Sequence, residues 1–287
     1  MNPPQPPFRE GESKGVCLRL IAERYFLRSS SNMKILRLEV PRWERFDGLI
    51  HGFLGRFSGQ DRPPNTAFRL SCDDGDDPQA VKRNWCELKQ ALSLPRITII
   101  TARQVHGDAV LKVSRGDDKL AGIGDGLMTD APNLCVGVMT ADCVPLLFVE
   151  PTRKIAAAVH AGWRGTAAGI APRAVTLMKE VYRIDPAALH VAMGPSIGPC
   201  CYEVGTEVAE QIAMHWREEL MDAWRPEGVK GRLDLRALNE AQLLGAGIPQ
   251  SHIRKIGPCT ACHVGDFFSY RKEGKSGHQL SFIGWRG

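Results

Sequence analysis

Two apolar stretches separated by a short polar turn constrain the fold of this chain more than any other feature. Val144–Val149 and Ile155–His160 are almost entirely hydrophobic, and Glu150–Arg153 between them contains turn-forming residues. Short apolar runs bounded by turn signals are typical of strands that are covered on both faces. The two runs therefore predict a β-hairpin buried inside the protein.

The expected register of this hairpin brings two metal-binding side chains together. With Pro151 and Thr152 at the tip, residue 150 pairs with 153 and, further along, Cys143 pairs with His160. Directly opposed Cβ atoms lie about 4.5–5.5 Å apart. A thiolate and an imidazole at that separation can share a zinc ion, at about 2.3 and 2.0–2.1 Å. A slip of one residue would put them on opposite faces, so the prediction depends on the register.

His106 is the candidate for a third ligand. It lies in Gln104–Gly107, just after the apolar run Ile97–Ala102, where a strand end before a glycine is well placed to face a cleft. Three nitrogen and sulfur ligands leave a fourth position for water or substrate, which is the pattern of catalytic zinc sites. From the residues alone, an inert thiol at Cys143 and packed, hydrogen-bonded histidines at His106 and His160 are alternative interpretations.

The segment after His160 predicts an anion site. His160–Thr166 joins a strand to a helix, and its glycines permit close approach of the backbone. Free N–H groups at the helix start would bind an anion with Arg164 as a bidentate clamp, unless Arg164 simply faces solvent. Asp142 is assigned as a proton carrier or as the partner of a ligand histidine, and a turn-stabilising role is equally open.

The nine cysteines are odd in number and irregularly spaced, which favours reduced thiols over a secreted disulfide framework. Cys259–His263 fits the haem-attachment pattern, but that attachment goes with export and we expect no signal peptide. A zinc site at Cys259 and Cys262 would need a second pair at matching spacing, and none is evident. The neighbouring Cys200 and Cys201 are interpreted as structural.

The composition is that of an ordinary soluble protein of 287 residues, with 43% hydrophobic and 24% charged residues. This length predicts one large domain, placed at residues 33–287 after a flexible leader at 1–32. The net charge of +5 is scattered, without the dense basic run that marks nucleic-acid binding. No apolar run has membrane-spanning length, so we expect a cytoplasmic protein with a small anionic substrate such as phosphate.

Strands and helices are mixed without a regular β-α-β order, which favours the α+β class over a doubly wound sheet. Hydrophobic periodicity predicts helices at Asp76–Leu92, Thr166–Tyr182, Val204–Trp216 and Leu235–Ala246. Besides the hairpin, it predicts strands at Ile35–Val40, Ile97–Ala102, Ala109–Val113, Leu134–Met139, Leu189–Met193, Ile253–Ile256 and Ser281–Trp285.

Several motifs occur in a fixed order along most of the chain. They are His51–Arg56, Gly75–Pro78, Gln104–Gly107, Asp125–Thr129, Thr140–Cys143, His160–Thr166, Gly194–Gly205, Cys259–Thr260 and Phe267–Arg271. Together they resemble the laccase-domain family, also called YfiH-like or multicopper polyphenol oxidase-like. The block from Ala-Asp-Cys to His-Ala-Gly-Trp-Arg-Gly is the most specific part. Ser58, Arg69 and Gly126 depart from the family pattern, which puts substrate preference in question.

The resemblance implies a zinc ion bound by His106, Cys143 and His160, and a pocket with Arg56 and Arg271 near substrate or phosphate. It implies a single domain of β-sheets packed together with helices outside, in α/β/β/α-like layers. The implied activities are phosphorolysis of adenosine, inosine, guanosine and methylthioadenosine, together with adenosine deamination. The implied partners are a purine nucleoside and phosphate, without nucleic acid or membrane, and the protein would be a monomer or homodimer.

Three alternatives stay open. A copper-dependent polyphenol oxidase would use the same ligands with an axial methionine, but multicopper sites need His-x-His pairs and the eight histidines form none. A cysteine hydrolase would use Cys143 as nucleophile and His160 as base. A structural metal would need a fourth protein ligand, such as Cys200 or Cys259.

Overall fold

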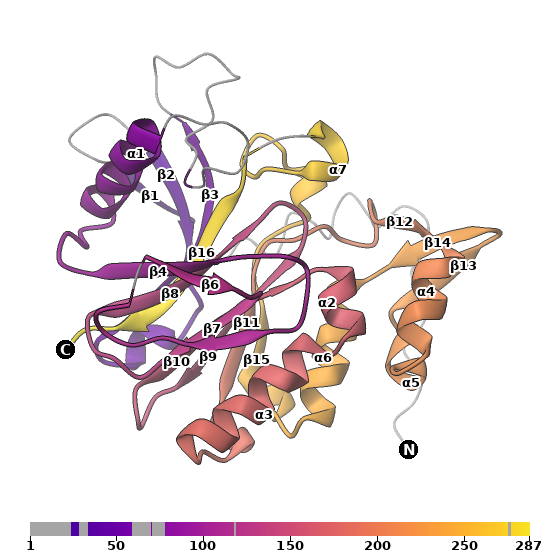
Figure 1. The fold of residues 1–287 in the computed structure, drawn as a ribbon. Helices are drawn as coiled ribbons and strands as arrows, with labels where there is room; N and C mark the ends of the chain where they lie inside the picture. Colours follow the sequence, from indigo (N-terminus) through magenta and orange to yellow (C-terminus); the bar gives the residue numbers. More distant parts are fainter. Residues whose placement is uncertain (1–23, 29–33, 59–69, 71–77, 118, 275–276) are drawn as a thin grey trace.

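Two β-sheets packed face to face form the centre of the protein, and helices cover their outer faces (Figure 1). The computed structural model describes residues 24–28, 34–58, 70, 78–117, 119–274 and 277–287. The predicted α+β class, with one domain of mixed sheets and helices outside, is confirmed. Arg69, most of Gly75–Pro78 and most of the leader lie outside the described residues.

The strands form two large sheets and one small one. In spatial order the first sheet contains β1 (Arg24–Arg28), β2 (Lys34–Leu38), β3 (Leu49–Ser58), β16 (Gln279–Trp285), β8 (Leu134–Thr140), β4 (Thr98–Arg103) and β6 (Leu120–Ile123). The second contains β15 (Ile253–Lys255), β11 (His190–Met193), β9 (Val144–Glu150), β10 (Ile155–Ala161), β7 (Gly126–Thr129) and β5 (Val110–Lys112). The small sheet contains β12 (Glu203–Gly205), β14 (Lys230–Leu233) and β13 (Trp224–Glu227).

The predicted hairpin lies at the centre of the layers. β9 and β10 are buried along their whole length, because the first sheet covers one face and helices cover the other. Between the sheets, Phe53 and Val136 from the first pack with Leu147 and Ala158 from the second. Burying one such large side chain stabilises the fold by about 1.5–3 kcal/mol. The apolar runs in the sequence reflect this double coverage.

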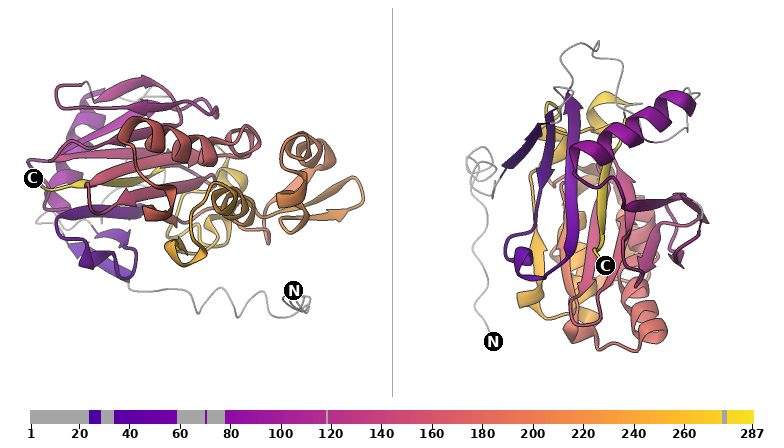
Figure 2. Two further views of the ribbon diagram at one scale, coloured as in Figure 1. Left: turned by 90° about the horizontal axis from the view of Figure 1, so that it is seen from below. Right: turned by 90° about the vertical axis from the view of Figure 1, so that its left-hand side faces the viewer.

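The helices lie on both sides of the two sheets (Figure 2). α1 (Pro78–Ala91) covers the first sheet, where Leu88 packs with Leu54 and Phe282. The helices α3 (Ile170–Tyr182) and α6 (Leu235–Gly245) pack against the second sheet. The remaining helices are α2 (Trp163–Ala167), α4 (Thr206–Ala213), α5 (Arg217–Met221) and α7 (Tyr270–Glu273).

Two predicted helices are shorter than expected. The chain turns at Gly169, whose φ of 78° is left-handed, so the predicted Thr166–Tyr182 helix is split into α2 and α3. Glu203–Gly205 pairs with β14, so the predicted Val204–Trp216 helix begins only at Thr206. In both segments hydrophobic periodicity continues across the break and conceals it.

One segment of the predicted leader, Arg24–Arg28, forms the strand β1. Arg24–Arg28 pairs antiparallel with β2, with Arg28 opposite Lys34. Backbone hydrogen bonds to β2 hold this segment as a strand. The amino-acid composition of the segment does not reveal such bonds. The strands β3, β6, β7 and β12–β14 were likewise not predicted.

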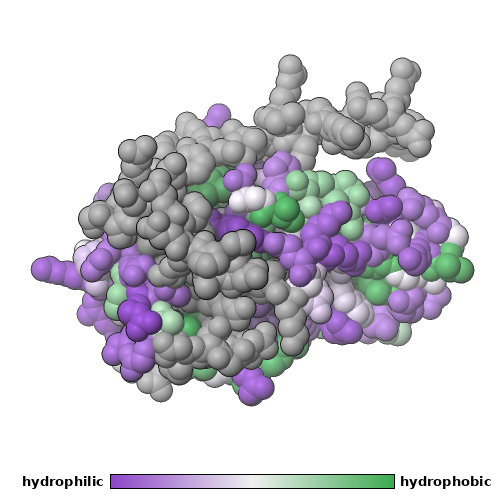
Figure 3. All heavy atoms as spheres, turned by 90° about the horizontal axis from the view of Figure 1, so that it is seen from above, coloured by the Kyte–Doolittle hydropathy of each residue, from purple (hydrophilic) through white to green (hydrophobic). Residues whose placement is uncertain are grey.

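The large hydrophobic side chains that are exposed among the described residues belong to many separate elements. On the one face that Figure 3 draws, the hydrophobic colour falls in several patches between hydrophilic ones. None of the helices within the described residues is both long and apolar enough to cross a membrane.

The buried His51 predicts an acid-sensitive fold. Its Nε2 accepts the backbone N–H of Val40 at 3.0 Å, and burial, with a smaller contribution from Arg37, lowers its pKa from 6.5 to about 3. Between these values the unfolded chain binds a proton that the folded chain does not, so stability is full above pH 6.5 and falls as the pH is lowered. At pH 4 the loss from His51 is about 3 kcal/mol.

Urea unfolding at pH 7 and pH 4 measures this loss. In His51→Gln, which keeps a hydrogen-bond acceptor but does not titrate, the difference in unfolding free energy between the two pH values should shrink by about 3 kcal/mol. An unchanged difference would show that His51 is not the group responsible.

Candidate metal centre

The hairpin register differs from the predicted one by two residues. Ile155 pairs with Glu150 and His160 pairs with Pro145, so the predicted direct pairing of His160 with Cys143 is wrong. Because strand side chains repeat every two residues, a shift of two keeps both groups on the same face. The prediction that they come together therefore survives the error in register.

The turn itself explains the shift. The Glu150 carboxylate accepts the backbone N–H groups of Thr152 at 3.2 Å and Arg153 at 2.7 Å, and Lys154 has a left-handed φ of 55°. These contacts make a four-residue turn in place of the expected two-residue tip. The length of a hairpin loop sets the register of its strands. Here the Glu150 carboxylate stabilises the longer loop, and the register shifts accordingly.

Three predicted ligands converge at one end of the sheets. His106 follows β4, Cys143 precedes β9 and His160 lies near the end of β10. One ligand atom from each lies within 4.8 Å of the other two. The two imidazole rings meet edge to face, with centroids 4.8 Å apart. His160 is buried, Cys143 is half-buried and His106 is exposed, so the group is open on the His106 side.

Asp125 holds this arrangement together. Its carboxylate accepts the backbone N–H groups of Val105, His106 and Gly107 at 3.1, 2.9 and 2.8 Å. The same group accepts a hydrogen bond from His160 Nδ1 at 2.8 Å. One fully buried carboxylate therefore fixes both the loop that carries His106 and the ring of His160. Asp125 was not predicted as part of the site. The signal in the sequence was its place at the start of the Asp125–Thr129 motif.

The Cys143 thiolate, the His160 imidazolium and the Asp125 carboxylate stabilise one another. Burial would raise the pKa of Cys143, but attraction to His160 and hydrogen bonds from both histidines lower it to about 6. Burial would lower the pKa of His160, but Cys143 and Asp125 raise it to about 9. Hydrogen bonds from His160 and the 105–107 backbone outweigh burial and lower the pKa of Asp125. The thiolate, which is the form that binds metals, is therefore favoured near neutral pH.

Asp142 lies beside Cys143 but contacts other groups. Its carboxylate accepts Thr260 Oγ1 at 2.6 Å and the backbone N–H of Arg271 at 2.7 Å. The carboxylate that orients a histidine is Asp125, so that part of the prediction for Asp142 was misassigned. Asp142 instead links the Cys143 segment to α7 and to the 260 segment.

The three predicted arginines differ in their surroundings. Arg271 donates from Nη1 to the carbonyl of Glu203 at 2.7 Å and lies over the Tyr202 ring. Arg164 is exposed and stacks on its neighbour Trp163. Arg56 forms an ion pair with Glu273 and stacks on Phe268.

Tyr202 is a further residue that the site predictions missed. Burial raises its pKa, Cys143 and Asp142 raise it further, and Arg271 and Arg164 act in the opposite direction. The hydroxyl of Tyr202 therefore lies in the electrostatic field of both the thiolate and two of the arginines. Its place inside the Gly194–Gly205 motif was the available signal.

A family model for multi-copper polyphenol oxidoreductase laccase matches residues 50–286. The chain belongs to this laccase family. The relative named purine nucleoside phosphorylase YlmD, from Geobacillus stearothermophilus, is 36% identical over 269 residues, covering 88% of this chain and 97% of the relative. Adenosine deaminase RL5, from an unknown prokaryotic organism, is 35% identical over 211 residues, covering 70% and 79%.

Solved structures agree with this assignment to the laccase family. The crystal structure of YlmD from Geobacillus stearothermophilus matches with a TM-score of 0.80 at 35% identity, covering 92% of this chain and all of that one. The crystal structure of Bacillus licheniformis hypothetical protein YfiH matches with a TM-score of 0.80 at 33% identity, covering 88% and 96%. The predictions that the chain is a member of this family and an enzyme are confirmed.

Gly162 leaves space for two side chains of the candidate metal centre. A Cβ at Gly162 would lie 2.9 Å from Cys143 Sγ and 3.1 Å from His106 Cδ2. We expect Gly162→Ala to displace both side chains and to weaken the binding of a metal ion such as Zn²⁺ at this site about tenfold, since overpacking costs about 1–3 kcal/mol. Zinc titration against a competing chelator measures the affinity. Gly245→Ala is the control, because a Cβ there meets nothing within 4 Å; equal affinities in both variants would contradict the prediction.

Proposed function

We propose that this chain is a zinc-dependent purine nucleoside phosphorylase that acts on adenosine, inosine, guanosine and methylthioadenosine, and that it also deaminates adenosine. The observation that carries the proposal is the convergence of His106, Cys143 and His160 from three separate elements. The names of the relatives supply the reaction class, because purine nucleoside phosphorylase and adenosine deaminase both occur among them.

The donor set fits zinc. Two imidazoles and one thiolate are ligands that Zn²⁺ binds well, and three protein ligands leave one position for a reactant. In the part of the chain that the structure describes, the group around His106 contains no fourth ligand atom. Bound zinc would supply a Lewis acid that polarises an oxygen of water or substrate.

The residues around the metal ligands would bind and orient the substrates. Arg271 lies over the Tyr202 ring, and Arg271 and Arg164 both act electrostatically on Tyr202. Their guanidinium groups would offset the charge of phosphate as it approaches the ribose. Asp142 holds the backbone of Arg271 in place, and proton transfer through Asp142 is part of the proposal. Arg56 forms an ion pair with Glu273 of α7, and we assign it to the binding of substrate or phosphate.

Copper chemistry is the second candidate, because the family model carries that name and a His, Cys, His set also occurs in blue-copper sites. A multicopper oxidase needs several histidine-rich centres. Among the described residues, the group around His106 is the single cluster with histidine ligands that could hold a metal. This observation favours zinc and phosphorolysis.

The test is phosphate-dependent release of free base from a panel of nucleosides. We expect adenosine, inosine and guanosine to give free base and ribose 1-phosphate, and methylthioadenosine to give adenine and methylthioribose 1-phosphate, only when phosphate is present. Adenosine should release ammonia as well. Phenol oxidation and metal content are measured on the same protein, purified without added metal. Base release that does not depend on phosphate, or phenol oxidation with bound copper, would refute the proposal.

We also propose that the reaction takes place in the cytoplasm and involves small molecules only. The described cysteines are all free, which suits a reducing compartment. The partners would be a purine nucleoside and phosphate.

A further inference from the structure

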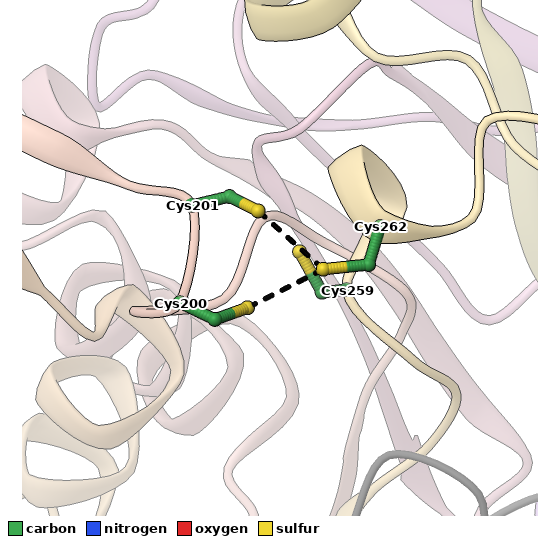
Figure 4. Close-up of side chains that lie close together, drawn as sticks. All are labelled: Cys200, Cys201, Cys259 and Cys262. Atoms are coloured by element: carbon green, nitrogen blue, oxygen red, sulfur yellow. Dashed lines mark hydrogen bonds between the residues drawn. The ribbon is translucent and has the colours of Figure 1, made fainter. Parts of the chain in front are cut away.

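Four cysteines outside the candidate metal centre meet at a second place in the fold (Figure 4). Cys200 and Cys201 lie in a turn that follows Gly198. Cys259 directly precedes the short 3-10 helix Thr260–Cys262, and Cys262 is the last residue of that helix. The four sulfur atoms all lie within 4.8 Å of one another. Cys259 and Cys262 therefore do have a second pair, and the contrary prediction was wrong.

The separations suit a single tetrahedral ion. Cys262 Sγ lies 3.6 Å from Cys200 Sγ and 3.4 Å from Cys201 Sγ. Four thiolates at about 2.3 Å from one zinc ion lie about 3.8 Å from each other. A disulfide needs about 2.05 Å, and an iron–sulfur cluster spreads its thiolates over several irons. We propose that Cys200, Cys201, Cys259 and Cys262 bind one structural Zn²⁺ ion.

The surroundings of the cluster favour thiolates. The backbone N–H of Gly198 donates to Cys259 Sγ at 3.2 Å, which stabilises negative charge on that sulfur. Four thiolates around one Zn²⁺ carry a net negative charge, and the Arg232 guanidinium donates to the Cys200 carbonyl at 3.4 Å. Cys259 is buried, whereas Cys200 and Cys262 are exposed, so an ion can enter from solvent.

The cluster also connects to the candidate active site. Thr260, between two of the ligands, donates from Oγ1 to Asp142 at 2.6 Å and from its backbone N–H to Ser196 at 3.0 Å. An ion held by the cluster would fasten the Gly194–Tyr202 loop to the 259–262 segment. It would thereby fix Asp142, the neighbour of Cys143. With four protein ligands the ion has no open position, so its role is structural.

Metal counting on the full chain tests the proposal. After purification under reducing conditions and dialysis against buffered zinc, elemental analysis should give two zinc ions per chain. Cys259→Ser and Cys262→Ser should each lose one ion, and His106→Ala should lose the other. Cys86→Ser, an exposed cysteine outside the cluster, should keep both. With cobalt in place of zinc, the intense thiolate-to-cobalt absorption should fall strongly in Cys262→Ser and little in His106→Ala.

A measurement on the unaltered protein guards against variants that fail to fold. Saturating zinc should block alkylation of Cys200 and Cys262 by N-ethylmaleimide and leave Cys86 reactive. A single zinc ion that His106→Ala removes, unchanged alkylation with zinc, or a disulfide between Cys262 and Cys200 or Cys201 in the reduced preparation would each overturn the second site. A normal metal count in His106→Ala would contradict the proposed function alone, so the two proposals fail separately.

Discussion

His106→Ala and Cys143→Ala should each lower kcat/KM for inosine phosphorolysis by about 10³-fold. Lewis-acid catalysis by a metal ion contributes several kcal/mol to the transition state, and each 1.36 kcal/mol corresponds to a factor of ten. Loss of about 4 kcal/mol therefore gives this fall. His106 is exposed, so its replacement should leave the fold intact. Initial rates with saturating phosphate, together with zinc content, provide the measurement.

This pair of variants also separates zinc chemistry from cysteine hydrolysis. A cysteine nucleophile needs Cys143 and His160 but not His106. If His106→Ala keeps most of the activity while Cys143→Ala abolishes it, the zinc mechanism is refuted. His215→Ala, an exposed histidine on another part of the surface, is the control and should behave like the original protein.

The hairpin at the centre of the fold could be predicted from the sequence, because strands that are buried on both faces consist almost entirely of apolar residues. Every residue of β9 and β10 is buried, and both strands appear as uninterrupted apolar runs. The position of Cys143 relative to His160 was correct in face and wrong in register. The face on which a strand residue lies follows from the two-residue repeat of the sequence. The length of the turn, in contrast, depended on hydrogen bonds to the Glu150 side chain.

The parts that could not be predicted depend on contacts between distant segments. Asp125 acts on Val105–Gly107 and on His160 because β7 pairs with β10, which brings Gly126 opposite Val159. Nothing local to Asp125 identifies those partners. The cysteine cluster forms because Ser196 bridges to Cys259, and adjacent cysteines at 200 and 201 do not match a familiar zinc spacing. Tertiary pairing, and not local pattern, assembled both.

Asp125→Asn should weaken zinc binding by about 10- to 100-fold, the usual result of removing a group that orients a metal-binding histidine. The single side-chain oxygen of asparagine can replace only one of the two carboxylate oxygens. If it replaces Oδ1, its NH₂ group would face the backbone N–H donors of Val105 and Gly107. The loop that carries His106 would then lose its anchor, at a cost of about 1–3 kcal/mol for each donor left unpaired.

Asp125 acts by positioning, so its effect should appear in zinc affinity and be reversed in part by excess zinc, unlike the loss in His106→Ala. Competition with a chelator measures the affinity, and activity at limiting and saturating zinc measures the rescue. Asp130→Asn, which changes an exposed carboxylate a few residues away, should alter neither. An Asp125→Asn variant that binds zinc as tightly as the original protein would show that the ligands hold their geometry without this carboxylate.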